Sequence, residues 1–181
     1  KIVIKNTSSS KLYVNSFYKG KPIKYDEKDE SKNITMTRKF VDMAGKEIDV
    51  KNLKVGTRFK MIITSKIESP ADISLLQILP SGWEFDNTQD NIGSPIPDDS
   101  PEAVDREEYG GDVDTVTYTD IRDDRVAYFF SSYSENSEEI ITINLIAVTP
   151  GTYRLPGTKA EGMYSRDHIA YLKGFEVKVK E

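Results

Sequence analysis

The chain has 181 residues, no cysteine, 37% hydrophobic residues and a formal net charge of -5 at pH 7. This length suits one ordinary domain, or one domain with part of another, and the lack of cysteine excludes disulfides, thiolate metal sites and cysteine nucleophiles within the chain. No apolar run approaches the roughly 20 residues that a membrane helix needs, and no basic stripe of the kind that binds nucleic acid is present, so we expect neither direct membrane insertion nor a nucleic-acid partner.

The first 25 residues contain two short strand patterns. Lys1–Lys5 places three β-branched apolar residues between two lysines, and Leu12–Val14 with Phe17–Tyr18 makes the second pattern after a polar turn at 6–10. Residues 26–33 are almost wholly charged or polar and have no apolar period, so they are predicted to be a linker. The chain has no initiating Met, and we expect it to be a piece of a longer protein.

From residue 34 onward, alternation of apolar and polar residues predicts a series of strands. The clearest of these are Ile34–Val41, Phe59–Ile63, Ile73–Leu79, Val126–Phe130, Glu138–Thr149 and Ala170–Lys180. Turns are predicted between them at Ala44–Lys46, Lys54–Thr57, Pro80–Gly82 and Pro150–Gly151. No window has a sustained helical period, and helical turns are expected only within 101–108. Seven or so short strands separated by turns predict an all-β fold, an antiparallel β-sandwich.

One long loop of this sandwich is predicted to be acidic. Residues 86–114 contain ten acidic residues and one basic residue, Arg106. The loop starts like an EF-hand at Asp86, but Thr88 stands at the third ligand position, no glycine stands at the sixth, and Pro97 stands at the twelfth, where it cannot chelate. An irregular calcium site and a simple solvated loop both remain open.

The stretch before Val126 contains a dense group of charges: Asp120, Arg122, Asp123, Asp124 and Arg125. Arginine and aspartate pair bidentately, so these residues are predicted to form a structural ion cluster, partly desolvated, at the start of a buried strand. On that basis Arg125→Ala is expected to cost about 1–3 kcal/mol of stability.

The same carboxylates permit an enzymatic alternative, glycoside hydrolysis by a pair of aspartates. A general acid must hold its proton near neutral pH, and the flanking arginines Arg122 and Arg125 favour the charged carboxylate instead. We therefore favour the structural interpretation of this cluster and expect no catalytic residue here.

His168 is the only histidine, so any Ser-His-Asp site would depend on it. Ser165 and Asp167 are close in sequence, but no nucleophile elbow surrounds any serine. We expect His168 to be a solvent-facing loop residue.

Two further places are predicted to be contact residues. Trp83 follows a tight turn and is expected to be a core or domain-contact aromatic. Glu161, Met163 and Tyr164 combine one acid with an apolar pair, which suggests a loop folded back onto the sandwich or onto a neighbouring domain, because Tyr and Met are frequent in contact surfaces.

Four stretches, in the expected order, resemble segments of bacterial alpha-2-macroglobulin-like proteins. They are Leu79–Glu84, the Arg122–Val126 segment, Ala147–Pro156 and Ala160–Tyr164. The resemblance implies a C-terminal macroglobulin-type β-sandwich, which is immunoglobulin-like, at 34–181. It also implies that 1–25 are the closing strands of a CUB-like domain, joined by a linker at 26–33. It is lost in the acidic loop and around 109–114.

The resemblance implies the mechanism of that family: a protease cuts a bait region, the molecule rearranges, and a Cys-Gln thioester can capture the protease. Nothing in this chain performs those steps. The resemblance therefore implies a non-catalytic module without cofactor, which packs on the thioester-type and CUB-like domains of its parent and meets proteases through that parent, in the periplasm or cell envelope. A carboxylate-based hydrolase on a β-sandwich and a generic adhesin-like structural module remain the alternatives.

Overall fold

The computed structural model describes residues 2–17, 19–20, 27–86 and 116–181. In these residues it contains thirteen strands and one 3-10 helix, η1 (Val50–Asn52). The strands are β1 (Glu30–Lys32), β2 (Ile34–Val41), β3 (Leu53–Lys54), β4 (Arg58–Ile67), β5 (Ala71–Ile78), β6 (Trp83–Phe85), β7 (Val116–Ile121), β8 (Arg125–Ser132), β9 (Ser137–Ala147), β10 (Gly151–Leu155), β11 (Thr158–Gly162), β12 (Ile169–Leu172) and β13 (Phe175–Lys180). The all-β prediction is confirmed.

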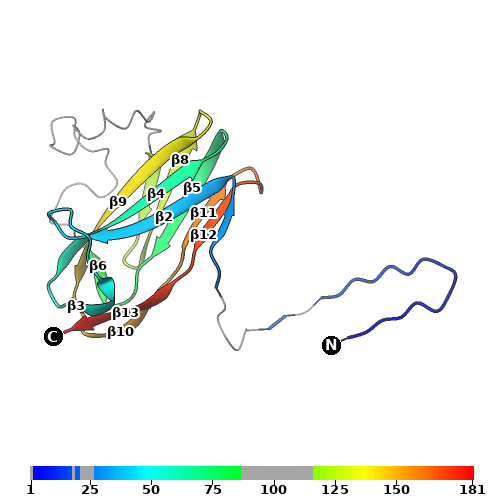
Figure 1. The fold of residues 1–181 in the computed structure, drawn as a ribbon, viewed down its shortest axis with the longest axis horizontal. Helices are drawn as coiled ribbons and strands as arrows, with labels where there is room; N and C mark the ends of the chain where they lie inside the picture. Colours follow the sequence, from blue (N-terminus) through cyan, green and yellow to red (C-terminus); the bar gives the residue numbers. More distant parts are fainter. Residues whose placement is uncertain (1, 18, 21–26, 87–115) are drawn as a thin grey trace.

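The strands form three sheets. A six-stranded sheet has the order β1-β12-β11-β5-β8-β7, a four-stranded sheet has the order β2-β4-β9-β6, and a three-stranded sheet has the order β10-β13-β3. The pairing is antiparallel except between β13 and β3. Figure 1 shows the four-stranded sheet lying over the six-stranded one, which is the predicted sandwich.

The sandwich buries the alternating apolar residues that the sequence places on one face of each strand. Phe59, Met61 and Ile63 of β4 are fully buried, and Met61 lies opposite Ile143 of β9. Burial of such side chains supplies most of the free energy that favours folding, at about 1.5–3 kcal/mol for each. The predicted core faces of these strands are confirmed.

β8, the strand that follows the charged group, is buried on one face as predicted. Val126, Tyr128 and Phe130 are buried, while the residues between them are partly exposed. Burial raises the pKa of the Tyr128 hydroxyl well above its usual value, so this tyrosine is neutral at physiological pH and behaves as a core aromatic.

The predicted turns at 44–46 and 54–57 are confirmed, and a glycine makes each possible. Gly45 has φ +84° and Gly56 has φ +82°, a left-handed conformation that glycine adopts at no steric cost. Asp42 supports the first turn, because its carboxylate accepts hydrogen bonds from the amides of Ala44 and Lys46 at 2.9 Å each.

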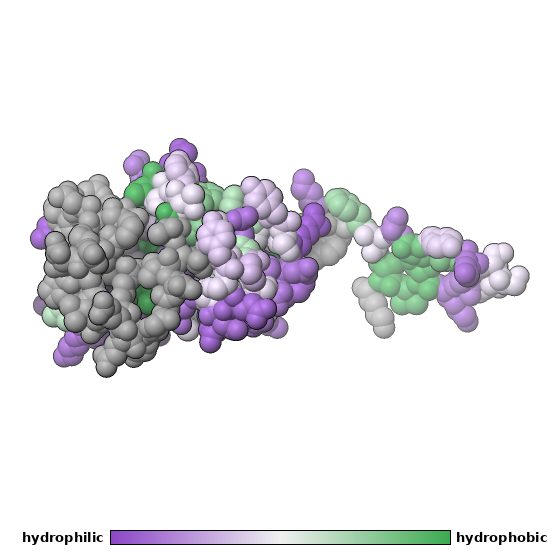
Figure 2. Space-filling view, turned by 90° about the horizontal axis from the view of Figure 1, so that it is seen from above, coloured by the Kyte–Doolittle hydropathy of each residue, from purple (hydrophilic) through white to green (hydrophobic). Residues whose placement is uncertain are grey.

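The two N-terminal strand patterns do not form strands among the residues that the structure describes. Residues 2–17 contain no strand there, although the polar turn at 6–10 is present and the side chain of Asn6 accepts from the amide of Ser8 at 2.9 Å. This segment projects away from the sandwich (Figure 1), and apolar side chains gather on it (Figure 2). Two short strand segments cannot bury an apolar face without a sheet to join, so the strand pattern stays exposed.

The predicted linker is partly structured. Its residues Glu30–Lys32 form β1, which pairs with β12 at the edge of the six-stranded sheet. Pairing through backbone hydrogen bonds needs no apolar side chains, which is why hydrophobic periodicity gave no sign of this strand. We call residues 27–33 the strap.

Two acidic side chains hold the N-terminal half of the strap. Glu27 accepts a hydrogen bond from the amide of Gly174 at 2.9 Å and pairs with Arg154 at 3.0 Å, and Asp29 accepts from the amide of Lys173 at 2.8 Å. The backbone hydrogen bond from Gly174 lowers the pKa of Glu27 below its ordinary value. These two acidic side chains of the strap therefore satisfy two backbone amides of the turn between β12 and β13.

The last predicted strand is divided in two. Residues 170–180 were expected to form one strand, but β12 and β13 lie in different sheets, and the chain crosses between them at Gly174. A Cβ atom at Gly174 would lie 2.4 Å from the carbonyl oxygen of Leu155, so the crossing depends on a residue without a side chain. The alternation in the second half is confirmed, with Val177 and Val179 buried.

Candidate functional site

The charged group is a hairpin turn between β7 and β8. The amide of Arg122 donates to the carbonyl of Arg125 at 2.8 Å, which closes the turn, and the amide of Leu79 donates to the carbonyl of Asp124 at 2.8 Å. The side chains make two ion pairs, Arg122 Nε to Asp120 Oδ1 at 2.9 Å and Arg125 Nε to Asp124 Oδ1 at 3.9 Å. The pairing with Asp120 raises the pKa of Arg122.

The group is more solvated than the sequence suggested. Asp124 keeps 65% of its side-chain surface exposed and Arg125 keeps 48%, and Asp123 is also exposed. Only Asp120 is partly buried, with 36% of its side-chain surface exposed, and the rest of the group faces water because it lies in a hairpin turn at the sheet edge. The backbone bonds of the turn, rather than the ion pairs, connect it to the sheet.

This exposure changes the expected effect of Arg125→Ala. Exposed ion pairs contribute roughly 0–1 kcal/mol, so the variant should lower the free energy of unfolding by less than about 1 kcal/mol, and not by the larger amount expected for a buried pair. Urea denaturation of the variant and the unmodified chain measures the difference. A loss above about 2 kcal/mol would show that a carboxylate in the turn is desolvated after all.

The predicted contact residues lie near the end of β11, which contains Glu161, and in the loop that follows, which contains Met163 and Tyr164. Met163 and Tyr164 expose 45% and 85% of their surfaces, while the amide of Met163 donates to the carbonyl of Asp72 at 2.8 Å. Glu161 pairs with Lys159 at 2.7 Å in an exposed contact. The backbone of this loop is thus fixed to β5 at Met163, and its two large side chains remain exposed. We call residues 163–168 the contact loop.

A groove of about 370 Å³ lies beside the contact loop. Its lining consists of Asp72, Thr117, Tyr118, Phe129, Phe130, Ser131, Met163 and Tyr164. Tyr118 and Phe129 pack at 5.8 Å between ring centroids, so the groove has an aromatic wall from β7 and β8 and a Met-Tyr wall from the contact loop. Aromatic and Met side chains are typical of the centre of a protein interface.

The groove does not support the carboxylate-hydrolase alternative. Glycoside hydrolysis needs two carboxyl groups facing one cleft, and the described lining of the groove has one, Asp72, whose carboxylate already accepts a hydrogen bond from Ser131 at 2.6 Å. The aspartates of the charged turn are not part of that lining.

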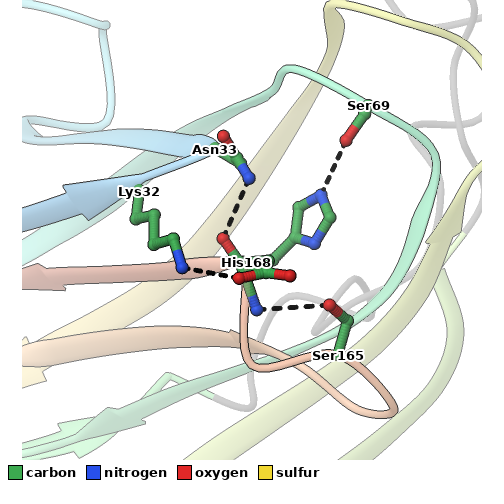
Figure 3. Close-up of polar contacts among 6 residues, drawn as sticks. Lys32, Asn33, Ser69, Ser165 and His168 are labelled. Carbon is green, nitrogen blue, oxygen red and sulfur yellow. Dashed lines mark hydrogen bonds and ion pairs between the residues drawn. The ribbon is translucent and has the colours of Figure 1, made fainter.

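His168 lies inside the fold and not in solvent, so the expectation of a solvent-facing loop residue is wrong. It exposes 6% of its surface, and its Nε2 lies 2.9 Å from Ser69 Oγ. Ser165 and Asp167 form no triad with it. The hydroxyl of Ser165 accepts from the amide of Asp167 at 3.2 Å, and the carboxylate of Asp167 pairs with Lys32 at 2.6 Å (Figure 3). The contact with Lys32 lowers the pKa of Asp167.

Trp83 is a core residue, the first of the two roles expected for it. It exposes 2% of its surface and packs edge-on against Phe59, at 4.9 Å between ring centroids, and against Phe40, at 6.0 Å. So little exposed surface remains that Trp83 cannot contribute appreciably to a domain contact.

The calcium expectation concerns the acidic loop, of which the structure describes only the first residue. Asp86 is buried and pairs with Arg58 at 3.0 Å, so its carboxylate is engaged at the end of β6. The remainder of the candidate calcium segment and the helical turns expected at 101–108 lie outside the described residues. Within the described ranges, no group of three or more His, Cys, Asp or Glu side chains is placed to hold a metal ion.

The described part of the chain also contains no helix with the length and apolar character needed to span a membrane.

Comparison with known proteins identifies the sandwich. The family described as the bacterial alpha-2-macroglobulin MG10 domain matches residues 34–167, most of the chain. The chain belongs to this family. Family membership confirms the resemblance and the prediction that the module is non-catalytic, since macroglobulin domains belong to a non-catalytic family of protease inhibitors.

Solved structures show the same fold. The chain is similar to E. coli alpha-2-macroglobulin in its native conformation, with a TM-score of 0.73 and 22% identity over 90% of the chain. It is also similar to a Y1175G mutant of Salmonella alpha-2-macroglobulin, with a TM-score of 0.70 and 21% identity over 86% of the chain. The trypsin-activated E. coli protein matches with a TM-score of 0.69 and 22% identity over 84% of the chain.

The likeness concerns one domain of a much larger protein. The chain covers 10% of the native E. coli and of the Salmonella chains, and 11% of the trypsin-activated E. coli chain. Among curated proteins, none matches the chain significantly. The activity and partners of the whole protein are therefore treated as proposals.

Proposed function

We propose that this chain is the C-terminal, non-catalytic domain of an alpha-2-macroglobulin-type protease trap, where it packs on neighbouring domains and holds or reports the conformational state of the trap. The observation that carries this proposal is the exposed pair Met163 and Tyr164 beside an aromatic groove, in a chain that belongs to the MG10 family. A neighbouring domain of the thioester type is the proposed partner of this surface.

The chemistry of the surface supports a protein partner. Tyr164 and Tyr118 are largely exposed, and Met163 is nearly half exposed. At about 25 cal/mol per Å² of buried apolar surface, covering such side chains gives a favourable contribution to domain packing. Asp72 and Ser131 add polar groups to the lining of the groove.

The N-terminal segment supports a second domain contact. In residues 2–17, large apolar side chains are between 52% and 94% exposed; they are Ile2, Val3, Ile4, Leu12, Tyr13, Val14 and Phe17. Soluble domains rarely leave so many apolar residues uncovered in one short segment. We infer that this segment completes a sheet of a preceding CUB-like domain in the parent, with residues 26–33 as the connection and the macroglobulin-type domain at 34–181.

Proteases are the proposed external partners of the parent protein, because related E. coli structures are described as activated by trypsin and by porcine elastase. Such a protein would act outside the cytoplasm, in the periplasm or at the cell envelope. Fractionation of cells that express the parent tests this location.

The experiment uses the parent protein and two variants, Met163→Ala with Tyr164→Ala as the double variant and Tyr133→Ala as the control. Tyr133 is 79% exposed but is not part of the groove lining. The parent is incubated with trypsin, and the activity of the protease is then assayed on a large protein and on a small peptide. We expect the unmodified parent and the control to suppress cleavage of the large substrate only, and the double variant to lose most of this selectivity.

Two results would contradict the proposal. If the unmodified parent leaves cleavage of both substrates unchanged, the trap function is wrong and the adhesin-like alternative gains. If the double variant protects as well as the parent, the contact loop is not the surface through which this domain serves the trap.

A further inference from the structure

Three turns contact one another at one end of the sandwich, and one of them is the end of the contact loop. They are the junction of β1 and β2 at Lys32 and Asn33, the turn between β4 and β5 at Glu68 and Ser69, and the end of the contact loop at Asp167 and His168 (Figure 3). We call this group of contacts the latch. Its members come from three separate parts of the chain, so the latch forms only in the folded domain.

The strap supplies two of the contacts that hold the contact loop. Lys32 Nζ lies 2.6 Å from Asp167 Oδ1, and the side-chain amide of Asn33 donates to the carbonyl oxygen of Asp167 at 3.1 Å. Lys32 thus contacts the side chain of Asp167, and Asn33 contacts its backbone. Together, these two residues of the strap hold Asp167 in position.

The other side of the loop is held from inside the sandwich. His168 Nε2 contacts Ser69 Oγ, and the amide of Gly162 donates to the carbonyl of His168 at 2.9 Å. The neighbouring Glu68 donates its amide to the carbonyl of Asn33 at 3.0 Å. Asn33 is thus connected both to the contact loop and to the turn that holds the contact loop.

Asn33 also has an unusual backbone. Its φ is +55°, a left-handed conformation that asparagine tolerates better than most residues. This conformation lets the chain leave the six-stranded sheet after β1 and join the four-stranded sheet at β2. A change in the direction of the strap therefore acts directly on the residue whose side chain holds Asp167.

We propose that Lys32 and Asn33 are positioning residues, which couple the strap to the contact loop and thereby set the orientation of Met163 and Tyr164. The inference rests on the proposed function in one respect, because it assigns a regulatory input to the surface proposed above. The strap joins the exposed N-terminal segment to the sandwich, so movement of the preceding domain reaches the contact loop through the latch. β1 pairs through only three residues, and short edge elements are among the first to open locally.

The test uses the full chain, which has no cysteine, so that one introduced cysteine carries one label. Arg166→Cys places a nitroxide on an exposed residue of the contact loop. Asn33→Gly tolerates the left-handed backbone and removes the whole side chain with its amide, while also giving the backbone more freedom. Lys32→Ala removes the ion pair and leaves the backbone at Asn33 unchanged. Lys39→Ala, an exposed residue of β2, is the matched control.

We expect the nitroxide spectrum to show greater mobility in Asn33→Gly and in Lys32→Ala, with a larger change when both are combined, and no change in Lys39→Ala. Amide exchange at Gly162 should become roughly tenfold faster in the double variant, the loss expected when a hydrogen-bonded contact is released. A spectrum and exchange rates equal to those of the unmodified chain would overturn the coupling. Should Asn33→Gly fail to fold, Lys32→Ala alone tests the coupling, because it removes the exposed ion pair with Asp167.

The protease assay on the parent separates this inference from the proposed function. Greater loop mobility together with unchanged trapping by the Lys32 and Asn33 variants supports the coupling and contradicts the role of the contact loop in the trap. Unchanged mobility together with a trap disabled by the Met163 and Tyr164 double variant overturns the coupling and leaves the proposed function intact.

Discussion

Replacing Trp83 by alanine is expected to lower the free energy of unfolding by about 3–5 kcal/mol. Trp83 begins β6, at the edge of the four-stranded sheet, and its ring lies edge-on against Phe40 and Phe59. Removing the indole leaves a cavity between strands that are already fully packed, and the two phenylalanine rings lose an aromatic partner. Urea denaturation followed by far-UV circular dichroism measures the loss.

Trp83→Phe is the matched control. The indole Nε1–H has no acceptor among the described residues, so phenylalanine loses volume without breaking a hydrogen bond. We expect a cost of about 1–2 kcal/mol for this variant. If alanine and phenylalanine cost the same, aromatic packing at position 83 does not account for the loss of stability.

Replacing Arg38 by methionine is expected to cost about 2–4 kcal/mol, although methionine retains much of the apolar volume. The guanidinium of Arg38 crosses from β2 to the six-stranded sheet. It donates to Thr158 Oγ1 at 2.9 Å, to Gln77 Oε1 at 3.3 Å and to the carbonyl of Lys173 at 3.1 Å. Gln77 and Thr158 are fully buried, so the loss of a donor leaves buried oxygens with fewer partners.

The environment of Arg38 is unusual for an arginine. Burial lowers its pKa to about 10, which still leaves it charged at neutral pH. The charge lies over the ring of Phe175, 5.2 Å from its centroid, and a cation above an aromatic face is attracted to it. Asp29 of the strap favours the charged form from a distance.

Arg38→Lys is the control that separates charge from geometry. Lysine keeps the positive charge but cannot reproduce the fork of donors that spans Thr158 and Lys173. A cost of about 1–2 kcal/mol, smaller than that of methionine, is expected for this variant. If lysine and methionine cost the same, the fork of hydrogen bonds and not the charge stabilises the crossing between the sheets. If methionine is as stable as arginine, the network contributes nothing to stability.

Local periodicity made the central strands predictable. In β4 and β8 every second residue is buried, and all of these residues except Ser65 and Ser132 are apolar, because side chains of a strand point alternately to its two faces. Turns with a required glycine, at Gly45 and Gly56, were predictable for the same local reason. Four short stretches in order were enough to predict the family that the comparison then showed.

The candidate site was only partly predictable. Met163 and Tyr164 were expected to be contact residues, and this remains a prediction, now placed beside a groove. The aromatic wall at Tyr118 and Phe129 was not foreseen, since nothing in the sequence shows that β7, β8 and the loop after β11 meet. The structural role of His168 was missed as well, because its partner Ser69 is 99 residues away.

By itself, the sequence determined the all-β class, the core face of each long strand and the absence of cysteine chemistry, because these depend on composition and on the local alternation of side chains. The tertiary structure decided which polar segments join a sheet and which charges are exposed. The strap has no apolar pattern, yet it pairs with β12 and contacts Gly174. The charged turn looks like a buried cluster, yet it faces solvent. Such outcomes depend on contacts between residues far apart in the chain, and a local pattern does not record them.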